Sequence, residues 1–390
     1  MSIEIVQNKC CGCRACEQKC AFCAISFTTD KYGFEYPRID SDKCTNCGAC
    51  ESVCPIINDA VASDAAVQCG MAYALDAQTK FNGSSGGIFG VLAQSVISNG
   101  GVVFGAAFDD ELKLKTTKAV TLDELKPLYK SKYLLCDTSG KFSEIESELK
   151  NGRTVLYCSS PCQISALKLY LKKDYENLIV VDFVCHGVGS QTLFDRSIEY
   201  TEKKDAIKIK NVILRYKKSN ATSYYYRYEY IKGGNNREKS DLYLSFPYYN
   251  AYCKQLACRD SCYDCKFATR ERVGDITIAD FHTVKKYFPA VDRFAGVSMV
   301  IVNTQKGADL FGLVSDKISW HAVDKEILYE NNRFSPEVVI PREQPAFRQS
   351  IAEQDFDTTV KRFLKPSRDF KKMIYYKSPK FLRDLIMKLR

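Results

Sequence analysis

The stretch TVLYCSSPCQISALKLYLKKDYENLIVVDFVCHG (residues 154–187) decides the fold of the larger part of this chain. It opens with a short apolar run, turns at residues 158–162, and continues as QISALKLYL, whose apolar residues recur at helical spacing. It ends in a continuous apolar segment of the kind that is buried in a parallel sheet. The order strand, helix, strand predicts a βαβ unit. We therefore expect an α/β core with a mixed sheet from about residue 65 to 330.

Chemically active side chains follow the two predicted strands. Cys158, Cys162, Cys185 and His186 come where the strands end, and ligands of open α/β sheets bind beyond the carboxyl ends of the strands. Cys162 also begins the predicted helix, a position that lowers the pKa of a thiol. Three roles stay open for Cys162: a catalytic thiolate, a cluster ligand, or a helix cap.

A glycine- and serine-rich turn lies upstream of this unit. Residues 88–97 have helical spacing, Gly100 and Gly101 end that helix, and residues 102–104 begin a strand. The helix is preceded by Gly83, Ser84, Ser85, Gly86 and Gly87. Free backbone N–H groups at such a helix start favour an anion, typically phosphate. An ordinary helix cap is the alternative interpretation.

Two cysteine runs open the chain. The first, CCGCRACEQKC (residues 10–20), has the spacing C-x2-C-x2-C-x3-C, and CTNCGACESVCP (residues 44–55) repeats it. This is the bacterial ferredoxin pattern, in which three cysteines bind one [4Fe–4S] cluster and the fourth binds the other. A zinc site, the alternative, usually shows two separated pairs of ligands. The crossover rule predicts cluster 1 on Cys10, Cys13, Cys16 and Cys54, and cluster 2 on Cys44, Cys47, Cys50 and Cys20.

A third cysteine group occurs near residue 260. Cys258, Cys262 and Cys265 lack one ligand of a full set, which Cys185 could supply from the predicted βαβ strand. A third [4Fe–4S] cluster, a zinc site and unligated thiols all stay open here. The stretch VGDITIADFH (residues 273–282) reads as a strand between Asp275 and Asp280, and its residues alone indicate no more than polar strand ends.

Composition and charge restrict the class of protein. The 390 residues include 19 cysteines, no leader peptide is apparent, and no apolar run is long enough to span a membrane. We therefore expect a cytoplasmic protein with reduced thiols. The tyrosine-rich stretch at residues 223–234 alternates like a strand, and no nucleic-acid motif accompanies it.

The basic character of the chain is concentrated in its tail. The net charge is +9, and residues 361–390 hold 11 basic and 2 acidic residues. SPKFLRDLIMKLR (residues 378–390) predicts an amphipathic basic helix. It could dock on its own domain, lie peripherally on the inner face of the membrane, or contact a partner protein.

The order of the short motifs resembles one family. The two ferredoxin runs are followed by SSGGIF (84–89), SKY (131–133), SPCQI (160–164), CHGV (185–188), SCYDCKF (261–267) and DITIADF (275–281). This order, over roughly residues 1–310, is similar to that of the beta subunits of coenzyme F-420 hydrogenases and dehydrogenases. The resemblance implies an iron–sulfur flavoprotein that transfers electrons.

The resemblance also implies roles for residues at matching positions. Ser84, Ser85, Gly86 and Gly87 would hold FAD near its phosphates, and Lys132 would be a second cofactor contact. Cys185, Cys258, Cys262 and Cys265 would bind a third cluster beside the flavin. Asp275 and Asp280 would lie near the flavin or a cluster. FMN in place of FAD stays open.

Together these features predict four regions and one leading function. We expect a ferredoxin-like α+β domain at 1–60, a flavin-phosphate region at 65–150, an α/β region with the third cysteine group at 151–330, and a basic helical tail at 331–390. The leading hypothesis is an oxidoreductase whose flavin exchanges hydride with an organic partner, coenzyme F-420 or another, while the clusters exchange electrons with a ferredoxin or another subunit. A non-catalytic electron-transfer subunit and a protein that uses clusters as staples are the alternatives.

Overall fold

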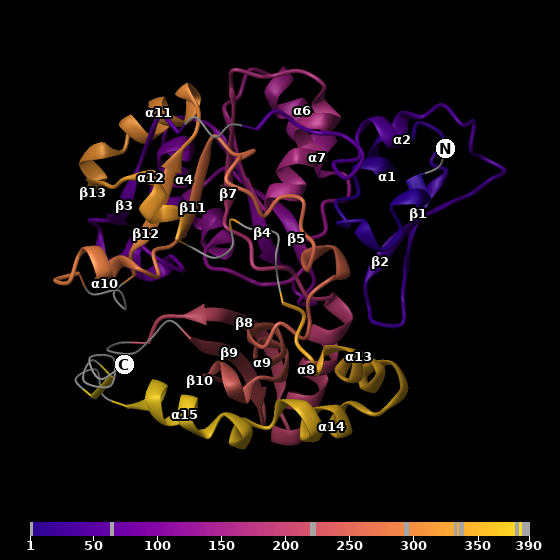
Figure 1. Ribbon diagram of the computed structural model, residues 1–390, viewed down its shortest axis with the longest axis vertical. Coiled ribbons are helices and arrows are strands. Elements are labelled where there is room, and N and C mark those ends of the chain that lie inside the picture. The colour runs from indigo at the N-terminus through magenta and orange to yellow at the C-terminus, as the bar shows by residue number, and fades with distance from the viewer. Residues whose placement is uncertain are drawn as a thin grey trace.

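The computed structural model describes residues 3–62, 66–218, 224–291, 296–330, 334, 339–378 and 382–383. Three parts are visible in Figure 1: a small N-terminal module, a large sheet flanked by helices, and a second layer of sheet and helices beneath it. The predicted combination of a ferredoxin-like module, an α/β core and a helical tail is confirmed.

An eight-stranded mixed sheet forms the centre of the molecule. Its order is β13-β3-β12-β11-β7-β6-β4-β5. The four strands β11, β7, β6 and β4 run parallel, while the outer strands pair antiparallel. The strands are β3 (Gln68–Ala74), β4 (Val102–Phe108), β5 (Leu114–Ala119), β6 (Val155–Ser159), β7 (Leu178–Phe183), β11 (Ile276–Asp280), β12 (Ser298–Val302) and β13 (Ile318–Ala322). Strands from both sides of residue 150 thus share one sheet.

The predicted βαβ unit at the sheet centre is confirmed as β6, α7 (Pro161–Leu171) and β7. Along β6, Leu156 packs into one apolar cluster, whereas Val155 and Tyr157 pack into another on the opposite face. Helices cover both faces, which is why a continuous apolar strand is stable here. These helices are α3 (Ala77–Asn82), α4 (Ile88–Ser98), α5 (Leu122–Leu125), α6 (Lys141–Lys150), α10 (Val284–Tyr287), α11 (Gln305–Gly312) and α12 (Lys325–Tyr329).

The N-terminal module is built on the repeat seen in the sequence. A hairpin of β1 (Ile25–Thr29) and β2 (Glu35–Ile39) joins two short helices, α1 (Ala15–Lys19) and α2 (Ala49–Ser52). The residue before each helix is left-handed, with φ 56° at Arg14 and 73° at Gly48. Both cysteine runs therefore turn back on themselves in the same way, as a repeated ligand loop requires.

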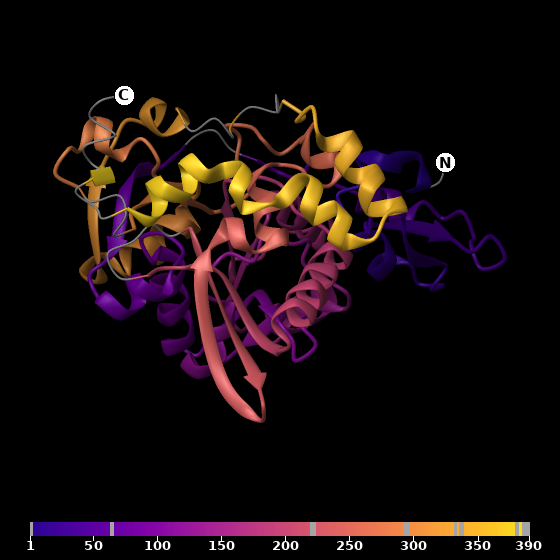
Figure 2. The same ribbon diagram turned by 90° about the horizontal axis from the view of Figure 1, so that it is seen from below.

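The second layer is a separate sheet with its own helices, whereas the sequence predicted a single α/β core for this part of the chain. An antiparallel sheet of β8 (Lys208–Tyr216), β9 (Tyr225–Lys232) and β10 (Asn235–Leu242) contains the predicted tyrosine-rich strand. Helices of the tail run along it, as Figure 2 shows from below. The helices of this layer are α8 (Gln191–Asp205), α9 (Pro247–Cys253), α13 (Gln344–Glu353), α14 (Phe356–Thr359) and α15 (Phe370–Lys377).

The predicted amphipathic helix at residues 378–390 lies outside the described residues except for Ser378, Leu382 and Arg383. Within the described part of the chain, no helix combines the length and the apolar character that crossing a membrane requires.

Candidate cofactor pocket and cysteine centres

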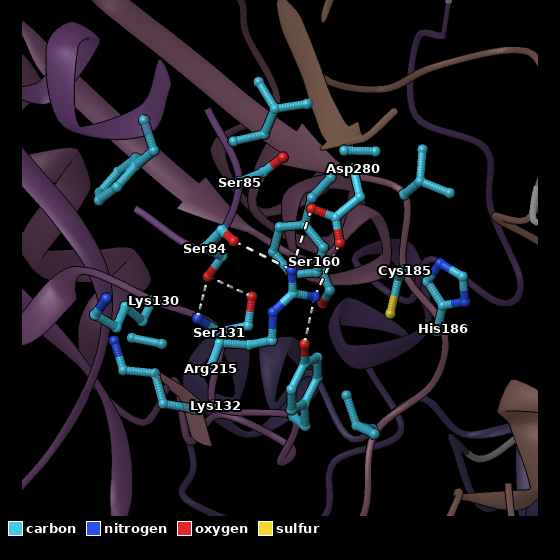
Figure 3. Close-up of a pocket in the computed structure, with 18 of the residues that line it drawn as sticks. Ser84, Ser85, Lys130, Ser131, Lys132, Ser160, Cys185, His186, Arg215 and Asp280 are labelled. Carbon is cyan, nitrogen blue, oxygen red and sulfur yellow. Dashed lines mark hydrogen bonds and ion pairs between the residues drawn. The ribbon is translucent and has the colours of Figure 1, made fainter. Parts of the chain in front are cut away.

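A cavity of about 560 Å³ lies between the large sheet and the second layer. The carboxyl ends of β6, β7 and β11 contribute to its wall, as expected for an open α/β sheet. Residues of α9 and α15 line the opposite side. Figure 3 shows how serine, lysine, arginine, aspartate, cysteine and histidine side chains surround this space.

The Ser84–Gly87 turn lines the cavity apart from Gly86, and other elements hold it in place. The Ser84 hydroxyl lies 3.0 Å from the Ser131 hydroxyl and accepts a hydrogen bond from the Ser131 N–H at 2.7 Å. Ser85 donates to the Val297 carbonyl at 2.7 Å. A Cβ atom at Gly86 would lie 2.4 Å from the Ala72 carbonyl, so a side chain there would push the turn off the sheet. The helix α4 begins directly after this turn.

Three lysines near the turn lack carboxylate partners among the described residues. Lys132 donates to the carbonyls of Pro127 and Tyr129, and Lys130 to that of Phe81. Lys217 donates to the carbonyls of Lys80 and Ser85. Burial lowers the pKa of Lys132 and of Lys217 to about 7 and that of Lys130 to about 8. Such cations fit a bound anion, because an anion would restore their usual charge.

An ion pair closes the next part of the wall. Arg215 on β8 contacts both carboxylate oxygens of Asp280 at 2.9 and 3.2 Å, and it donates to the Tyr133 hydroxyl at 3.0 Å and to the Ser84 carbonyl at 3.1 Å (Figure 3). Burial alone would raise the pKa of Asp280, but Arg215 and His282 lower it to about 2. Asp280 is therefore a fixed anion that orients Arg215 toward the turn.

Aromatic rings form the remaining wall. The ring of Tyr133 stacks on that of Tyr252 at a centroid distance of 4.4 Å and on that of Tyr249 at 5.4 Å. All three rings line the cavity, and Tyr376 of α15 joins them. A flat apolar wall next to a cationic end suits a ligand that carries both a planar ring system and phosphates.

Asp275 is a predicted cofactor-site residue that lies apart from the cavity. Its carboxylate accepts hydrogen bonds from the Val180 N–H and the Thr304 hydroxyl, both at 2.7 Å, and it does not line the cavity. Asp275 precedes β11 and Asp280 ends it, so the two lie roughly 16 Å apart along the strand. Asp275 instead ties β7 to the loop after β12.

The N-terminal cysteines form an inner and an outer set. Cys10, Cys16 and Cys54 are buried in one apolar cluster, which Cys20 and Cys50 border. Burial raises the pKa of the Cys16 thiol, and the neighbouring thiols of Cys10 and Cys54 raise it further. Cys13 is also buried, whereas Cys47 is exposed and Cys44 half-buried. The predicted ligands of cluster 1 therefore lie deep, and those of cluster 2 near the surface.

The third cysteine group gathers where the module meets the large sheet. Burial raises the pKa of Cys185 to about 12, with further contributions from the thiols of Cys162, Cys265 and Cys258. Burial likewise raises the pKa of Cys262, and Cys185, Cys265 and Cys162 add to it. The structure thus brings together the four cysteines of the predicted third set and adds Cys162 to them.

Cys162 differs from the expectation for a helix start. Its pKa is raised, first by a hydrogen bond with the Cys11 thiol and then by burial, so the favourable position at the start of α7 does not dominate. Its sulfur lies 3.2 Å from the Ser160 hydroxyl, and it does not line the cavity. A buried thiol with a raised pKa is better suited to a ligand or structural role than to that of a reactive thiolate.

The donor sets can be tested against the metal groups they would hold. Among the described residues, no three His, Cys, Asp or Glu side chains converge as ligands of a single metal ion. A [4Fe–4S] cluster needs thiolates at four separate corners instead. Crowded, buried thiols with raised pKa values fit such a cluster, because binding iron is what stabilises their thiolate form.

Several residues that line the cavity were not predicted from the sequence. Arg215 follows Leu214 in β8, where a register irregularity between Ile213 and Tyr216 brings two consecutive residues inside. Arg215 and Lys217, a buried arginine and lysine two residues apart, come directly after the apolar run at residues 212–214, and that spacing was the available signal. Tyr249 and Tyr252 could not be singled out from the sequence, because tyrosines are abundant in this part of the chain.

Comparisons with known proteins give two family matches along the chain. Residues 152–326 match the family described as the C-terminal part of the "Coenzyme F420 hydrogenase/dehydrogenase, beta subunit", and residues 9–57 match the 4Fe-4S dicluster domain. No curated protein matches the chain. Among solved structures, a chain of the F420-reducing [NiFe] hydrogenase complex from Methanosarcina barkeri is similar at 13% identity, over 76% of this chain and 90% of that one, with a TM-score of 0.44.

Proposed function

We propose that this chain, whose residues 152–326 match the C-terminal part of the coenzyme F420 hydrogenase/dehydrogenase beta subunits, is an iron–sulfur flavoprotein oxidoreductase of that family. A flavin bound in the cavity would exchange two electrons as hydride with an organic partner and single electrons with the clusters. The dicluster domain at residues 9–57 supports the iron–sulfur part. The flavin, the hydride exchange and the third cluster are part of the proposal.

One observation carries the proposal. Cys185 lines the cavity and also lies among the thiols of the third cysteine group. A ligand in the cavity and a cluster on that group would therefore share a wall. This adjacency is what electron exchange between the two requires.

The chain's own residues would hold the flavin as follows. The Ser84–Gly87 turn and the Ser131 hydroxyl would contact the diphosphate, and Lys130 and Lys132, which line the cavity, would supply positive charge. Lys217 supports the turn from outside the cavity lining by donating to the Ser85 carbonyl. The rings of Tyr133, Tyr249 and Tyr252 would pack on the planar part. Arg215, fixed by Asp280, would orient the middle of the molecule. FAD, with its diphosphate and its planar rings, would occupy both the cationic end and the aromatic wall of the cavity. We therefore propose FAD rather than FMN.

The cysteine sets suggest the direction in which electrons are relayed. The predicted outer cluster lies near the surface, since Cys47 is exposed. The predicted inner cluster borders the third group, since Cys11 between its ligands hydrogen-bonds Cys162. We propose that a protein redox partner, a ferredoxin or another subunit, docks beside the outer cluster, while the organic partner enters the cavity.

The test measures whether electrons reach a bound flavin through the module. Protein loaded with FAD is mixed anaerobically with reduced methyl viologen, and bleaching of the flavin absorption is followed in time. The variant Cys44→Ser, which removes a ligand of the outer cluster, should slow bleaching at least about tenfold. Cys23→Ser is the matched control, because Cys23 is an exposed cysteine outside the predicted ligand sets.

Two outcomes would contradict the proposal. If the wild-type chain retains no FAD under these conditions, the cavity does not serve as proposed. If Cys44→Ser bleaches as fast as Cys23→Ser, the module is not the entry point for electrons.

A further inference from the structure

Arg259 connects the third cysteine group to the first cysteine run. It follows Cys258 in sequence, and its side chain is completely buried. Its Nε donates to the Cys10 carbonyl at 2.6 Å, and one terminal nitrogen donates to the Glu35 carbonyl at 2.8 Å. The guanidinium lies 4.1 Å from the centre of the Tyr36 ring. Two segments more than 200 residues apart thus meet at this one cation.

The charge of Arg259 has no carboxylate partner within the described parts of the chain, and its second terminal nitrogen has no hydrogen-bond acceptor there. The neighbouring carboxylates are engaged elsewhere. Glu35 pairs with Arg14 at 2.6 Å, and Asp260 pairs with Arg348. A fully buried, unpaired cation is strongly unfavourable unless a negative group lies close to it.

A cluster on the first run would supply that negative group. The guanidinium donates to the carbonyl of Cys10, which is a predicted ligand of cluster 1. Tyr36 beneath it packs against the apolar cluster that contains Cys10, Cys16 and Cys54. A [4Fe–4S] cluster with four thiolates is anionic and becomes more so on reduction. A nearby fixed cation therefore favours the reduced state, since net charge is one of the factors that set cluster potentials.

We propose that Arg259 is the counter-ion of cluster 1 and raises its reduction potential above that of cluster 2, so that an electron entering the module settles beside the third cysteine group. Arg259 is a positioning residue for charge and does not bind the cluster itself. This inference rests on the part of the proposed function that assigns cluster 1 to Cys10, Cys13, Cys16 and Cys54, and it is independent of the flavin.

The experiment is a potentiometric titration followed by electron paramagnetic resonance on protein purified without oxygen. At the wild-type midpoint of the inner cluster, Arg259→Gln should lower the ratio of reduced to oxidised cluster about tenfold, which for one electron corresponds to a midpoint about 59 mV lower. Arg259→Lys keeps the charge and should stay close to wild type. Arg270→Gln removes an exposed arginine paired with Glu326 and should change nothing.

Each result has a defined meaning. If Arg259→Gln loses four irons while Arg259→Lys keeps them, the charge is needed to hold the cluster, and the inference stands in a stronger form. If both variants lose the cluster, or if Arg259→Gln has the wild-type midpoint, the charge is not the counter-ion. If the wild type itself shows no iron–sulfur signal, the proposed function fails before this inference is reached.

Discussion

At the scale of single residues, Arg215 and Asp280 decide how charge is distributed around the cavity. Asp280 pairs with Arg215, and its side chain is 25% exposed against 10% for Arg215. The pair leaves the guanidinium directed toward Ser84, beside the lysines that have no carboxylate partner in the described part of the chain. This arrangement of charge fits the anion site that we propose.

Replacing Asp280 by asparagine should destabilise the protein, because it leaves Arg215 buried with a neutral partner. We expect a loss of roughly 2 kcal/mol, seen as a lower Tm. The pKa of Asp280 is lowered to about 2, so its contribution is fully present above pH 4 to 5 and is lost only as pH falls toward 2. The difference from wild type should thus be constant between pH 5.5 and 8. Asp110→Asn, at an exposed position, is the control.

Lys132 should make the affinity for FAD depend on pH. Burial lowers its pKa to about 7, so the free protein carries this charge at pH 6 and has mostly lost it at pH 8. Binding an anion favours the charged form, and affinity should fall as pH rises, by at most about tenfold per unit for one proton. Lys132→Met should weaken binding at pH 6 and reduce the slope of this dependence, as measured by fluorescence titration with FAD. Lys130, whose pKa is lowered to about 8, should keep part of the dependence.

The control for that prediction is Lys43→Met, which removes an exposed lysine of the module. An affinity that is independent of pH in the wild type, or a Lys132→Met profile parallel to it, would remove Lys132 from the binding of the phosphates.

At the residue scale, the sequence is most informative where neighbouring residues carry the chemistry. Ser84, Ser85 and Lys132 were expected at a cofactor site, and they line the cavity. Asp275 lies apart from the cavity, because the full length of β11 separates it from Asp280. Arg259 was invisible because its partners, Cys10 and Glu35, lie more than 200 residues away in sequence.

At the scale of elements, the turn before α4 is the feature most sensitive to backbone geometry. Gly87 has φ +86°, and a Cβ there would lie 2.8 Å from the Thr79 carbonyl. Gly140 precedes α6 with φ +70° and has nothing within 4 Å. A side chain would therefore strain the backbone similarly at both positions, but only at Gly87 would it also collide with a neighbouring residue.

Alanine at Gly140 should cost about 1 kcal/mol of stability from strain alone, and the flavin content should not change. Alanine at Gly87 should cost more and should reduce the flavin content, because the turn must move away from Thr79. Thermal unfolding and released flavin on both variants test this. Equal flavin content in the two variants would mean that the turn does not contact the cofactor.

Element-scale prediction was strongest for the βαβ unit. Residues 154–187 fold as expected, because each segment has one clear hydrophobic period and a proline-led helix start at Pro161. The second layer was missed as a separate unit. Its strands β8 to β10 mix polar and aromatic residues, and their partners α13 and α15 come more than 100 residues later in the chain.

At the scale of the whole molecule, the module is fixed to the core rather than tethered. The buried Thr138 hydroxyl donates to the Cys13 carbonyl at 2.7 Å, and the Phe142 N–H donates to Gln18 at 2.9 Å. Arg14 pairs with Asp137 at 3.1 Å. The proposed electron transfer across this junction would therefore need no domain movement.

Removing one of these contacts should loosen the junction without unfolding the sheet. Thr138→Val leaves the Cys13 carbonyl unsatisfied at a cost of about 1–2 kcal/mol. Hydrogen exchange should rise in residues 10–20 and stay unchanged in β6 and β7. Thr117→Val, on the neighbouring edge strand β5, is the control. Uniform exchange across the chain would indicate that the module and core unfold as one unit.

The most direct test of the central claim is one composition measurement on protein purified without oxygen. Iron, acid-labile sulfide and released flavin are determined on the same sample. We expect about twelve irons, about twelve sulfides and one flavin per chain. About eight irons with no flavin, even after FAD has been supplied, would contradict this expectation and would leave the chain an electron carrier whose cavity serves another purpose.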